Sequence, residues 1–397
     1  MKKLFVSAVM ILVLILFAKN SFAVVDGWAG ENGGTTGGAG GPTITVYDEP
    51  NLIKYASYLT PGPYIVQVSG TINIPTTESA AGHLEVSSSK TIRGIGSNPT
   101  IIGNFGFKNR DGNIIVENLN ITNPYKGSAY DGMSVKQEIH NVLITKCSFF
   151  DTGDGACDIS NESDYVTVSW CKFYYTASAP DPGHTFASLV GSSDKQIEDA
   201  DDLHVTYHHN WWTTGVKERM PRVRYGQVHV YNNYYSDLVA GGYCVGVGVA
   251  SNIRVENNYF NSVPMPWKDY YTGTGYAAGH IGWNTGNIYY NCSQPTWATN
   301  EYSTIFTPPY AYSLDDAADV PAEVMAYAGA GTPYPPHWLF TNYGDFDRNG
   351  QINLSDLYTF VNYWLNGDCS SLSDADYDGN CKVNFFEFSL MAENWLD

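Results

Sequence analysis

The chain has 397 residues, of which 43% are hydrophobic and only 15% are charged, and 40 acidic residues against 21 Lys and Arg give a formal net charge of −19. This length allows one large domain and one small one, and this composition excludes wholesale disorder. The acidity argues against a nucleic-acid partner, because phosphate neutralisation requires clustered Lys and Arg.

The segment 1–23 has the pattern of a secretory signal peptide. Two lysines at positions 2 and 3 precede an apolar run, Leu4–Ala18, and small side chains at positions 21 and 23 fit a cleavage site. The run has about 15 apolar residues, fewer than the ~20 needed to span a membrane, and no later stretch could span one. We therefore expect a secreted protein, extracellular or at the cell surface, whose mature chain begins near Val24.

One short pattern recurs after a Gly-rich entry, Gly27–Gly41. It reads branched apolar, any residue, Val or Ile, two further residues, then Asn, Cys or His, with aromatics after most copies. The copies begin at positions 114, 142, 166, 203, 228 and 253, so the intervals between successive starts are 28, 24, 37, 25 and 25. Such a period, with one short strand per copy, indicates stacked units around a continuous core. We therefore predict an all-β fold, a parallel β-helix, over residues 24–331.

Stacking converts sequence columns into spatial ladders with a spacing of ~4.8 Å. Cys147 and Cys171 should then be neighbours, either as a disulfide or as two stacked buried thiols. Asn233 and Asn258 should form a ladder of side chains, and His208 falls in the same column of the pattern. The long interval between the third and fourth copies predicts an extra loop over 177–202, where binding residues usually lie.

Three aspartates recur at the coil period. Asp131 and Asp154 are separated by an interval of 23, close to one coil, and Asp158 follows Asp154 at an interval of four. Carboxylates from adjacent coils would form a nest for Ca²⁺. The alternative is that these aspartates only cap turns at the corners of the β-helix.

A cationic cluster follows the fourth repeat. Lys217, Arg219, Arg222 and Arg224 lie close together in a chain that has 21 Lys and Arg in all. Such a cluster is typical either of an anion-binding site or of a solvated face with ion pairs.

Several sequence blocks around the cationic cluster allow a more specific interpretation of it. They are Ser163–Ser169, Leu189–Asp194, Val205–Asn210, Arg219–Asn233 and the closing Tyr312–Val320. In this order they resemble the signature blocks of the polysaccharide lyase family 1 pectate lyases, and the resemblance covers residues 25–331. It implies a right-handed parallel β-helix that binds Ca²⁺ and cleaves polygalacturonate, the backbone of pectin, by β-elimination to 4,5-unsaturated oligogalacturonates.

The resemblance also implies roles for individual residues. Arg219 would be the base, Arg224 a binder of the substrate carboxylate, and the three aspartates the calcium ligands. Two positions depart from the family pattern, because Ala129 replaces an additional Asp of some relatives and Phe186 replaces a frequent substrate-binding Lys. The candidate substrate-binding residues of this chain are therefore Arg224, Arg222, Lys217 and His184, the last two as substitutes for that lysine.

β-Elimination requires removal of the proton on C5 of a galacturonate. Cations on the adjacent carboxylate acidify this proton, because the intermediate resembles an enolate. Since an arginine side chain is protonated at neutral pH, an arginine base predicts an alkaline pH optimum.

Three alternatives remain open from the residues. A β-helical polygalacturonase would use Asp154 and Asp158 as paired carboxylates for hydrolysis. A pectin lyase acting on methyl esters would have no use for a carboxylate nest. A non-catalytic pectin-binding protein would use the solenoid only as a binding face.

The segment 341–397 differs in kind, since it holds ten acidic side chains and two basic ones after a Pro-rich linker over 332–340. Two loops with the spacing of calcium loops begin at Asp345 and Asp376, and apolar stretches that fit helices, Leu357–Leu365 and Phe388–Trp395, follow them. The candidate ligands are Asp345, Asp347, Asn349, Gln351 and Asp356 in the first loop, and Asp376, Asp378, Asn380, Lys382 and Glu387 in the second.

This pair of loops resembles a type I dockerin, an α-helical, EF-hand-like calcium module that docks onto a cohesin partner. The recognition pairs would be Leu354-Ser355 and Phe385-Phe386, which differ between the copies. The alternative is a tail that is stapled by calcium and has no partner. Cys369 and Cys381 flank the second loop and could add a disulfide.

Overall fold

The computed structural model describes residues 25–75, 82–108, 110–270, 275–292, 305–333, 352, 354–364, 383, 388 and 391. The chain divides into two compact units, one over Val25–Pro333 and one that joins Met1–Val24 with Tyr334–Asp397. The predicted signal segment lies outside the described residues, and so do nine of the ten candidate ligands of the C-terminal loops. No helix of the described residues is both long and apolar enough to cross a membrane.

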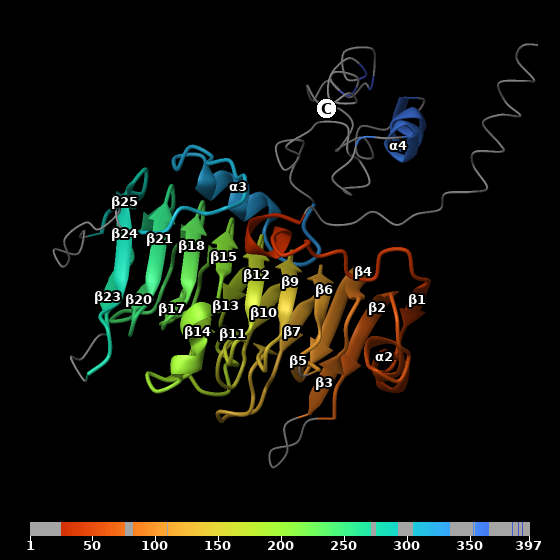
Figure 1. Cartoon of the computed structure of the whole chain (residues 1–397), viewed down its shortest axis with the longest axis horizontal. Helices are drawn as coiled ribbons and strands as arrows, with labels where there is room; N and C mark the ends of the chain where they lie inside the picture. Colours follow the sequence, from red (N-terminus) through yellow and green to blue (C-terminus); the bar gives the residue numbers. More distant parts are fainter. Residues whose placement is uncertain are drawn as a thin grey trace, which may run out of the picture. The chain divides into compact units, whose positions relative to one another are not determined.

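The first unit is a solenoid of parallel strands, coil after coil along its long axis (Figure 1). Each full coil contributes two strands to a 17-stranded sheet and one to an 8-stranded sheet. One ladder of the large sheet consists of β1 (Thr43–Val46), β2 (Tyr64–Asn73), β4 (Lys90–Ile102), β6 (Gly112–Glu117), β9 (His140–Thr145), β12 (Asp164–Ser169), β15 (Val205–His208), β18 (Gln227–Tyr231), β21 (Asn252–Glu256) and β24 (His280–Thr285).

The second ladder of the large sheet begins at the end of β4 and continues through β7 (Asn120–Thr122), β10 (Ser148–Phe150), β13 (Lys172–Tyr174), β16 (Trp211–Trp212), β19 (Tyr234–Tyr235), β22 (Tyr259–Asn261) and β25 (Ile288–Tyr290). The 8-stranded sheet consists of β3 (His83–Val86), β5 (Asn104–Phe107), β8 (Met133–Val135), β11 (Cys157–Ile159), β14 (Leu189–Val190), β17 (Arg222–Val223), β20 (Val245–Val247) and β23 (Trp267–Asp269). This arrangement confirms the predicted parallel β-helix.

The fourth repeat is displaced by two positions from the predicted alignment. The pattern places Leu203 opposite Val166, but in the structure Val205 pairs with Val166 on one side and with Val228 on the other. The intervals on either side of this repeat are therefore 39 and 23, where the pattern gave 37 and 25. The physical reason is local: Leu203 adopts φ +59° and turns the chain before the strand begins.

The correction moves Asn210 into the column that the pattern gave to His208. Asn210 Nδ2 donates to Asn233 Oδ1 at 2.9 Å, Asn233 Nδ2 to Asn258 Oδ1 at 3.0 Å, and Asn258 Nδ2 to Asn287 Oδ1 at 3.0 Å. The predicted asparagine ladder is confirmed and has four rungs. An asparagine suits each rung because its amide can both accept and donate between coils.

Asn233 lies at the centre of this ladder, and removing its side chain should destabilise the β-helix. Its Oδ1 accepts from Asn210 N and its Nδ2 donates to Tyr207 O, both at 2.9 Å. We expect Asn233→Ala to lower the free energy of unfolding by about 2–5 kcal/mol, since several buried polar groups lose their partners. Thermal unfolding would measure this, with Asn120→Ala at a half-buried position as the control. Equal losses in both variants would contradict the prediction.

Two further ladders fill the interior beside the asparagines. Cys147 and Cys171 are buried free thiols on adjacent coils, so the structure favours stacked thiols over a disulfide. Aromatic rings stack on successive coils in the series Phe149, Phe173, Trp212, Tyr235, Phe260 and Tyr289, with neighbouring centroids 4.2–6.2 Å apart. Both ladders follow from the near-constant length of one coil.

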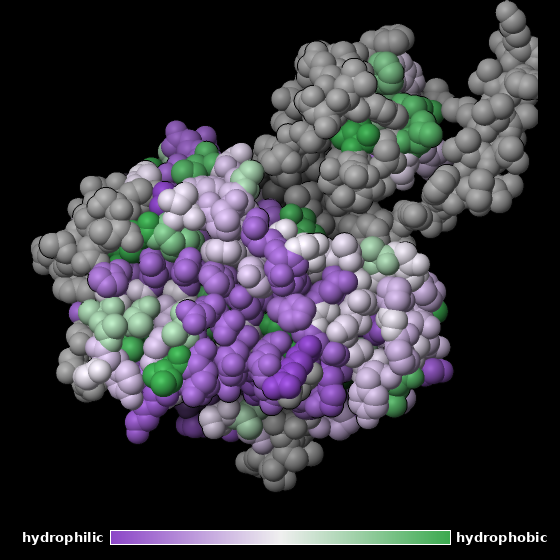
Figure 2. All heavy atoms as spheres, viewed as in Figure 1, coloured by the Kyte–Doolittle hydropathy of each residue, from purple (hydrophilic) through white to green (hydrophobic). Residues whose placement is uncertain are grey.

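Segments from both ends of the unit cover parts of the β-helix. The short helix η1 (Gly27–Gly30) packs on β12 and β15, and Gly27 adopts φ +62° where a Cβ would lie 2.7 Å from Thr206 Oγ1. Helix α2 (Glu49–Ala56) packs on β2 and β3, and α3 (Val320–Tyr327) packs on β19. On the face shown in Figure 2, hydrophilic side chains gather over the central coils.

The predicted extra loop over 177–202 is only partly a loop. β14 runs between β11 and β17 as a rung of the 8-stranded sheet, and η2 (Ile197–Asp201) follows it. So short a rung carries no periodic pattern, and the sequence could not reveal it.

The second unit contains α4 (Leu354–Trp364), which confirms a helix in the apolar stretch that starts at Leu357. Phe360 of this helix packs with Val383 and Met391 in a small core. Asp356, the candidate ligand that ends the first loop, lies buried in the first turn of α4.

Candidate active site

Neighbouring strands of the 8-stranded sheet place the predicted acidic and cationic residues side by side. Ser134, Asp158, Leu189 and Arg222 are paired in register across β8, β11, β14 and β17. The neighbouring Val190 and Val223 are fully buried, so the registered residues point to the outer face. The candidate site is therefore the outer face of this sheet and the turns that precede its strands.

The three aspartates lie on two adjacent coils, as predicted. Asp131 Oδ1 accepts a hydrogen bond from Gly155 N at 3.2 Å, and Asp131 Oδ2 accepts one from Ser134 Oγ at 2.7 Å. Asp158 Oδ1 accepts from Leu189 N at 2.9 Å. Burial and repulsion by Asp154 raise the pKa of Asp131 to about 6, although the hydrogen bond from Ser134 acts in the opposite direction. Burial and repulsion by Asp131 raise the pKa of Asp158.

The donor set fits a hard cation. The oxygens come from carboxylates, which Ca²⁺ prefers, and a positive charge would offset the repulsion that raises both pKa values. The glycine at position 155 leaves room for the Asp158 carboxylate, because a Cβ at this position would lie 2.2 Å from Asp158 Oδ1. The oxygens of all three aspartates do not lie within 4.8 Å of one another, however, because Asp154 turns toward His184.

Arg219 occupies a strained position directly before β17. Its backbone adopts φ +67°, a left-handed conformation that is uncommon for a residue with a side chain. The flanking backbone holds it there, since Arg219 O accepts from Ser188 N at 2.6 Å and Met220 N donates to Cys244 O at 2.8 Å. The structure thus fixes this side chain against the adjacent coil.

The Arg219 guanidinium lies between an aromatic ring and a carboxylate. Its Cζ is 4.4 Å from the centroid of the Phe186 ring, and its Nη1 is 3.8 Å from Asp154 Oδ1. The same Asp154 oxygen is 2.5 Å from His184 Nε2. Arg219 Nε is buried and has no hydrogen-bond partner. The sequence showed Phe186 only as a missing lysine, but the structure makes it the surface on which Arg219 rests.

The other predicted cations differ in how they are engaged. Arg224 Nε lies 2.6 Å from Asp194 Oδ1, and its Nη1 donates to Gly191 O at 2.8 Å. Lys217 Nζ lies 3.5 Å from Gly183 O. Burial and the neighbouring Arg224 lower the pKa of Arg222, whose Nε has no hydrogen-bond partner. The partner Asp194 belongs to the block Leu189–Asp194, so the sequence contained a signal for it that spacing alone did not reveal.

Comparison with known proteins identifies the family that carries this site. A family model described as pectate lyase matches residues 1–333. The chain belongs to the pectate lyase family.

Curated relatives agree with this assignment to the pectate lyases. A pectate trisaccharide-lyase of Thermotoga sp. (strain RQ2) is 35% identical over 326 residues, which cover 75% of this chain and 85% of that protein. A pectate trisaccharide-lyase of Bacillus licheniformis is 30% identical, and the match covers 78% of this chain and 87% of that protein. A pectate lyase of Bacillus subtilis (strain 168) is 25% identical, over 77% of this chain and 92% of that protein.

Solved structures show the same fold. The crystal structure of pectate lyase Bsp165PelA from Bacillus sp. N165 in complex with trigalacturonate is 27% identical, with a TM-score of 0.63. The match covers 77% of this chain and 99% of that chain. Because almost the whole of that protein is matched, the C-terminal unit is an addition to the pectate lyase fold.

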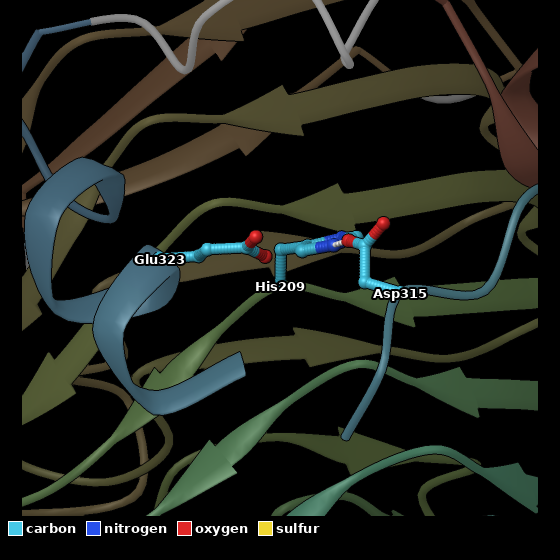
Figure 3. A group of neighbouring side chains, drawn as sticks. All are labelled: His209, Asp315 and Glu323. Carbon is cyan, nitrogen blue, oxygen red and sulfur yellow. Dashed lines mark hydrogen bonds and ion pairs between the residues drawn. The ribbon is translucent and has the colours of Figure 1, made fainter. Parts of the chain in front are cut away.

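A second group of potential metal ligands in this pectate lyase family member consists of a residue that follows β15, one in the segment before α3 and one in α3. Ligand atoms of His209, Asp315 and Glu323 lie within 4.8 Å of one another, the one such triple among the described residues (Figure 3). His209 Nε2 is 2.6 Å from Asp315 Oδ2, and its Nδ1 is 2.8 Å from His208 Nδ1. Both ring nitrogens of His209 thus lie within hydrogen-bond distance of another side chain. The contact with Asp315 holds the segment before α3 against the coil of β15.

Proposed function

We propose that the protein is a secreted, calcium-dependent pectate lyase that cleaves α-1,4-linked polygalacturonate by β-elimination. The observation that carries the proposal is the position of Arg219. It is fixed on Phe186, whose coil lies between that of Arg219 and that of Asp154 and Asp158, and its guanidinium lies 3.8 Å from Asp154 and beside the cation Arg222. This arrangement presents a base next to a surface that binds carboxylates.

The chemistry follows from these groups. Arg224, which is paired with Asp194, and Arg222 bind the substrate carboxylate, and Arg219 accepts the C5 proton. The electron pair of the C5–H bond forms the C4=C5 double bond, and the C4–O bond breaks, so that its electron pair leaves with the glycosidic oxygen, which takes up a proton from water. Asp131, Asp154 and Asp158 would hold Ca²⁺, which would supply positive charge that neutralises the uronate and acidifies C5–H. Because the base must lose a proton, we expect an alkaline pH optimum.

The relatives support the substrate class. Those from Thermotoga sp. and Bacillus licheniformis are named pectate trisaccharide-lyases, and the Bacillus sp. N165 enzyme was solved with trigalacturonate. Hydrolysis is less favoured, because a glycosidase keeps one of two carboxyls protonated as the acid near the bond. Here Asp154 is instead engaged by His184 and Arg219.

One assay tests the proposal directly. With polygalacturonate and Ca²⁺ at alkaline pH, we expect the absorbance of the unsaturated product to rise, and excess chelator to abolish the rise. Fully methylated pectin is the control for a pectin lyase, and reducing-sugar formation is the control for a hydrolase. Reducing sugar without absorbance would refute elimination, and activity that survives chelation would refute the role of calcium.

The termini add two further parts to the proposal. The N-terminal pattern supports export, which sequencing of the mature N-terminus would test. The spacing of the C-terminal loops, the helix α4 and its small core with Val383 and Met391 support a calcium module of the dockerin kind. Calcium-dependent retention on an immobilised cohesin would distinguish docking from a tail that only folds around calcium.

A further inference from the structure

One cluster of side chains outside the candidate active site joins the end of the first unit to the β-helix. His209 adopts φ +53° in the turn between β15 and β16, and its ring stacks on Trp170 with centroids 4.2 Å apart. Asp315 precedes α3 and Glu323 belongs to this helix, and Figure 3 shows both side chains directed toward the His209 ring. Separate segments thus bring an imidazole and two carboxylates to one point.

The Glu323 carboxylate lacks a partner for one of its oxygens. Its Oε2 is buried and has no hydrogen-bond partner, and no lysine or arginine of the described residues forms an ion pair with Asp315 or Glu323. Burial and repulsion by Asp315 and Asp319 raise the pKa of Glu323 to about 7. A buried carboxylate oxygen without a partner is rare, because it loses its hydration and gains no contact in return. A cation at this point would supply the missing contact.

The neighbouring histidine contacts are short of one proton. His208 Nε2 lies 3.0 Å from Asp26 Oδ1, and His208 Nδ1 lies 2.8 Å from His209 Nδ1. The third contact joins His209 Nε2 to Asp315 Oδ2 at 2.6 Å. Three such contacts need three protons, but two neutral imidazoles carry only two. Burial lowers the pKa of His209 to about 4, so its ring is neutral at neutral pH.

A metal ion on His209 Nε2 would remove this shortage. His209 would then donate from Nδ1 to His208 Nδ1, and His208 would donate from Nε2 to Asp26, so that each N–H has one acceptor. A hydrogen bond from the other ring nitrogen is the usual way in which a protein orients a histidine that binds a metal ion. One imidazole with two carboxylates suits a first-row ion such as Zn²⁺, whereas Ca²⁺ takes oxygen ligands.

We propose that His209, Asp315 and Glu323 bind a divalent transition-metal ion of the Zn²⁺ class, with water at the remaining position. This site shares no residue with the candidate calcium site and takes no part in the elimination. Tetrahedral ligands at about 2.1 Å lie about 3.4 Å apart, so the contact between His209 Nε2 and Asp315 Oδ2 lengthens when the ion binds. The Asp315 side chain is 24% exposed, which gives the ion access. The bound ion holds α3 and the segment before it on the turn after β15, and it thereby stabilises the β-helix.

Titration of the full chain with Zn²⁺ tests the site, in a buffer with saturating Ca²⁺ that occupies sites made of oxygen ligands. We expect calorimetry to show binding, and the Tm of the β-helix to rise by about 3–8 °C at a Zn²⁺ concentration of about 100 times Kd. Glu323→Gln should weaken binding by about 10-fold or more and remove most of the rise in Tm, because an anionic ligand is lost. Asp315→Asn should act in the same way.

Asp319→Asn is the matched control for the charge of Glu323. Asp319 is exposed at the start of the same helix, and its side chain makes no capping hydrogen bond. We expect this variant to change the affinity for Zn²⁺ by less than about threefold, since a remote exposed charge is screened. With Co²⁺ in place of Zn²⁺, the visible absorption of the bound ion should change in Glu323→Gln and stay the same in Asp319→Asn. In chelator, Glu323→Gln should unfold at no lower temperature than the wild type, which shows that its fold is intact.

The results that would overturn the inference are distinct. If Zn²⁺ neither binds the wild type nor raises its Tm, the cluster is only a hydrogen-bonded group that fastens α3. Equal binding by the wild type, Glu323→Gln and Asp315→Asn would place the ion elsewhere in the chain. Equal losses in Glu323→Gln and Asp319→Asn would show an effect of general charge without ligation. None of these measurements depends on the cleavage of polygalacturonate, so they stand whether or not the proposed function holds.

Discussion

Arg219→Ala is expected to lower kcat by about 10³-fold, within the range of about 10²–10⁴ that a general base contributes. The variant removes the guanidinium that lies on Phe186 and next to Asp154. Because the loss concerns proton removal, kcat and kcat/KM should fall together while binding of polygalacturonate changes little. Initial rates of absorbance increase, measured at saturating Ca²⁺ from neutral to alkaline pH, provide the test.

Two further variants make the result specific to Arg219. Lys217→Ala removes a nearby charge on the same segment and should keep kcat within about threefold, since its Nζ reaches only Gly183 O at 3.5 Å. Arg219→Lys keeps the charge but loses the planar group that lies on Phe186, so we expect partial activity with a shifted pH profile. If Arg219→Ala retained kcat within about tenfold of the wild type, another residue would have to be the base.

The sequence predicted the fold well because the β-helix repeats its register in the chain itself. A coil of nearly constant length places branched residues, asparagines and cysteines in columns, and these columns became the observed ladders. The prediction failed where the coil length changes. Leu203 resembles the branched residue of a repeat, but its positive φ ends a turn, and only the pairing of Val205 with Val166 and Val228 shows the correct register.

The site was predictable in its residue types and only partly in its contacts. Spacing near one coil brought Asp131 beside Asp154 and Asp158 of the next coil, because that distance is a property of the repeat. The partners of Arg219 and Arg224 were not predictable in this way. Phe186 and Asp194 come from a long insertion between repeats, where a very short rung and its flanking turns decide which side chains meet.

Replacing Asp158 with asparagine should stabilise the calcium-free protein and impair the enzyme. The free energy of unfolding in chelator should rise by on the order of 1–2 kcal/mol, since the amide removes the negative charge of a half-buried side chain beside Asp131. In the wild type, Asp158 Oδ1 accepts a hydrogen bond from Leu189 N at 2.9 Å. The side-chain oxygen of the asparagine can accept the same hydrogen bond. At limiting Ca²⁺ we expect kcat/KM to fall about 10²-fold or more. Thermal unfolding in chelator and rates across a calcium titration would measure the two effects.

The opposite signs of these two effects separate a functional carboxylate from a structural one. If Asp158 only capped a turn, Asp158→Asn would leave activity unchanged at every calcium concentration, or it would lower stability in chelator. Asp347→Asn is the control for calcium that binds to the C-terminal loops. This variant should weaken calcium binding by those loops, while kcat/KM and the unfolding of the β-helix stay unchanged. A stable, inactive Asp158→Asn variant would show that the charge repulsion between Asp131 and Asp158 is retained for the reaction, at a cost to the stability of the calcium-free fold.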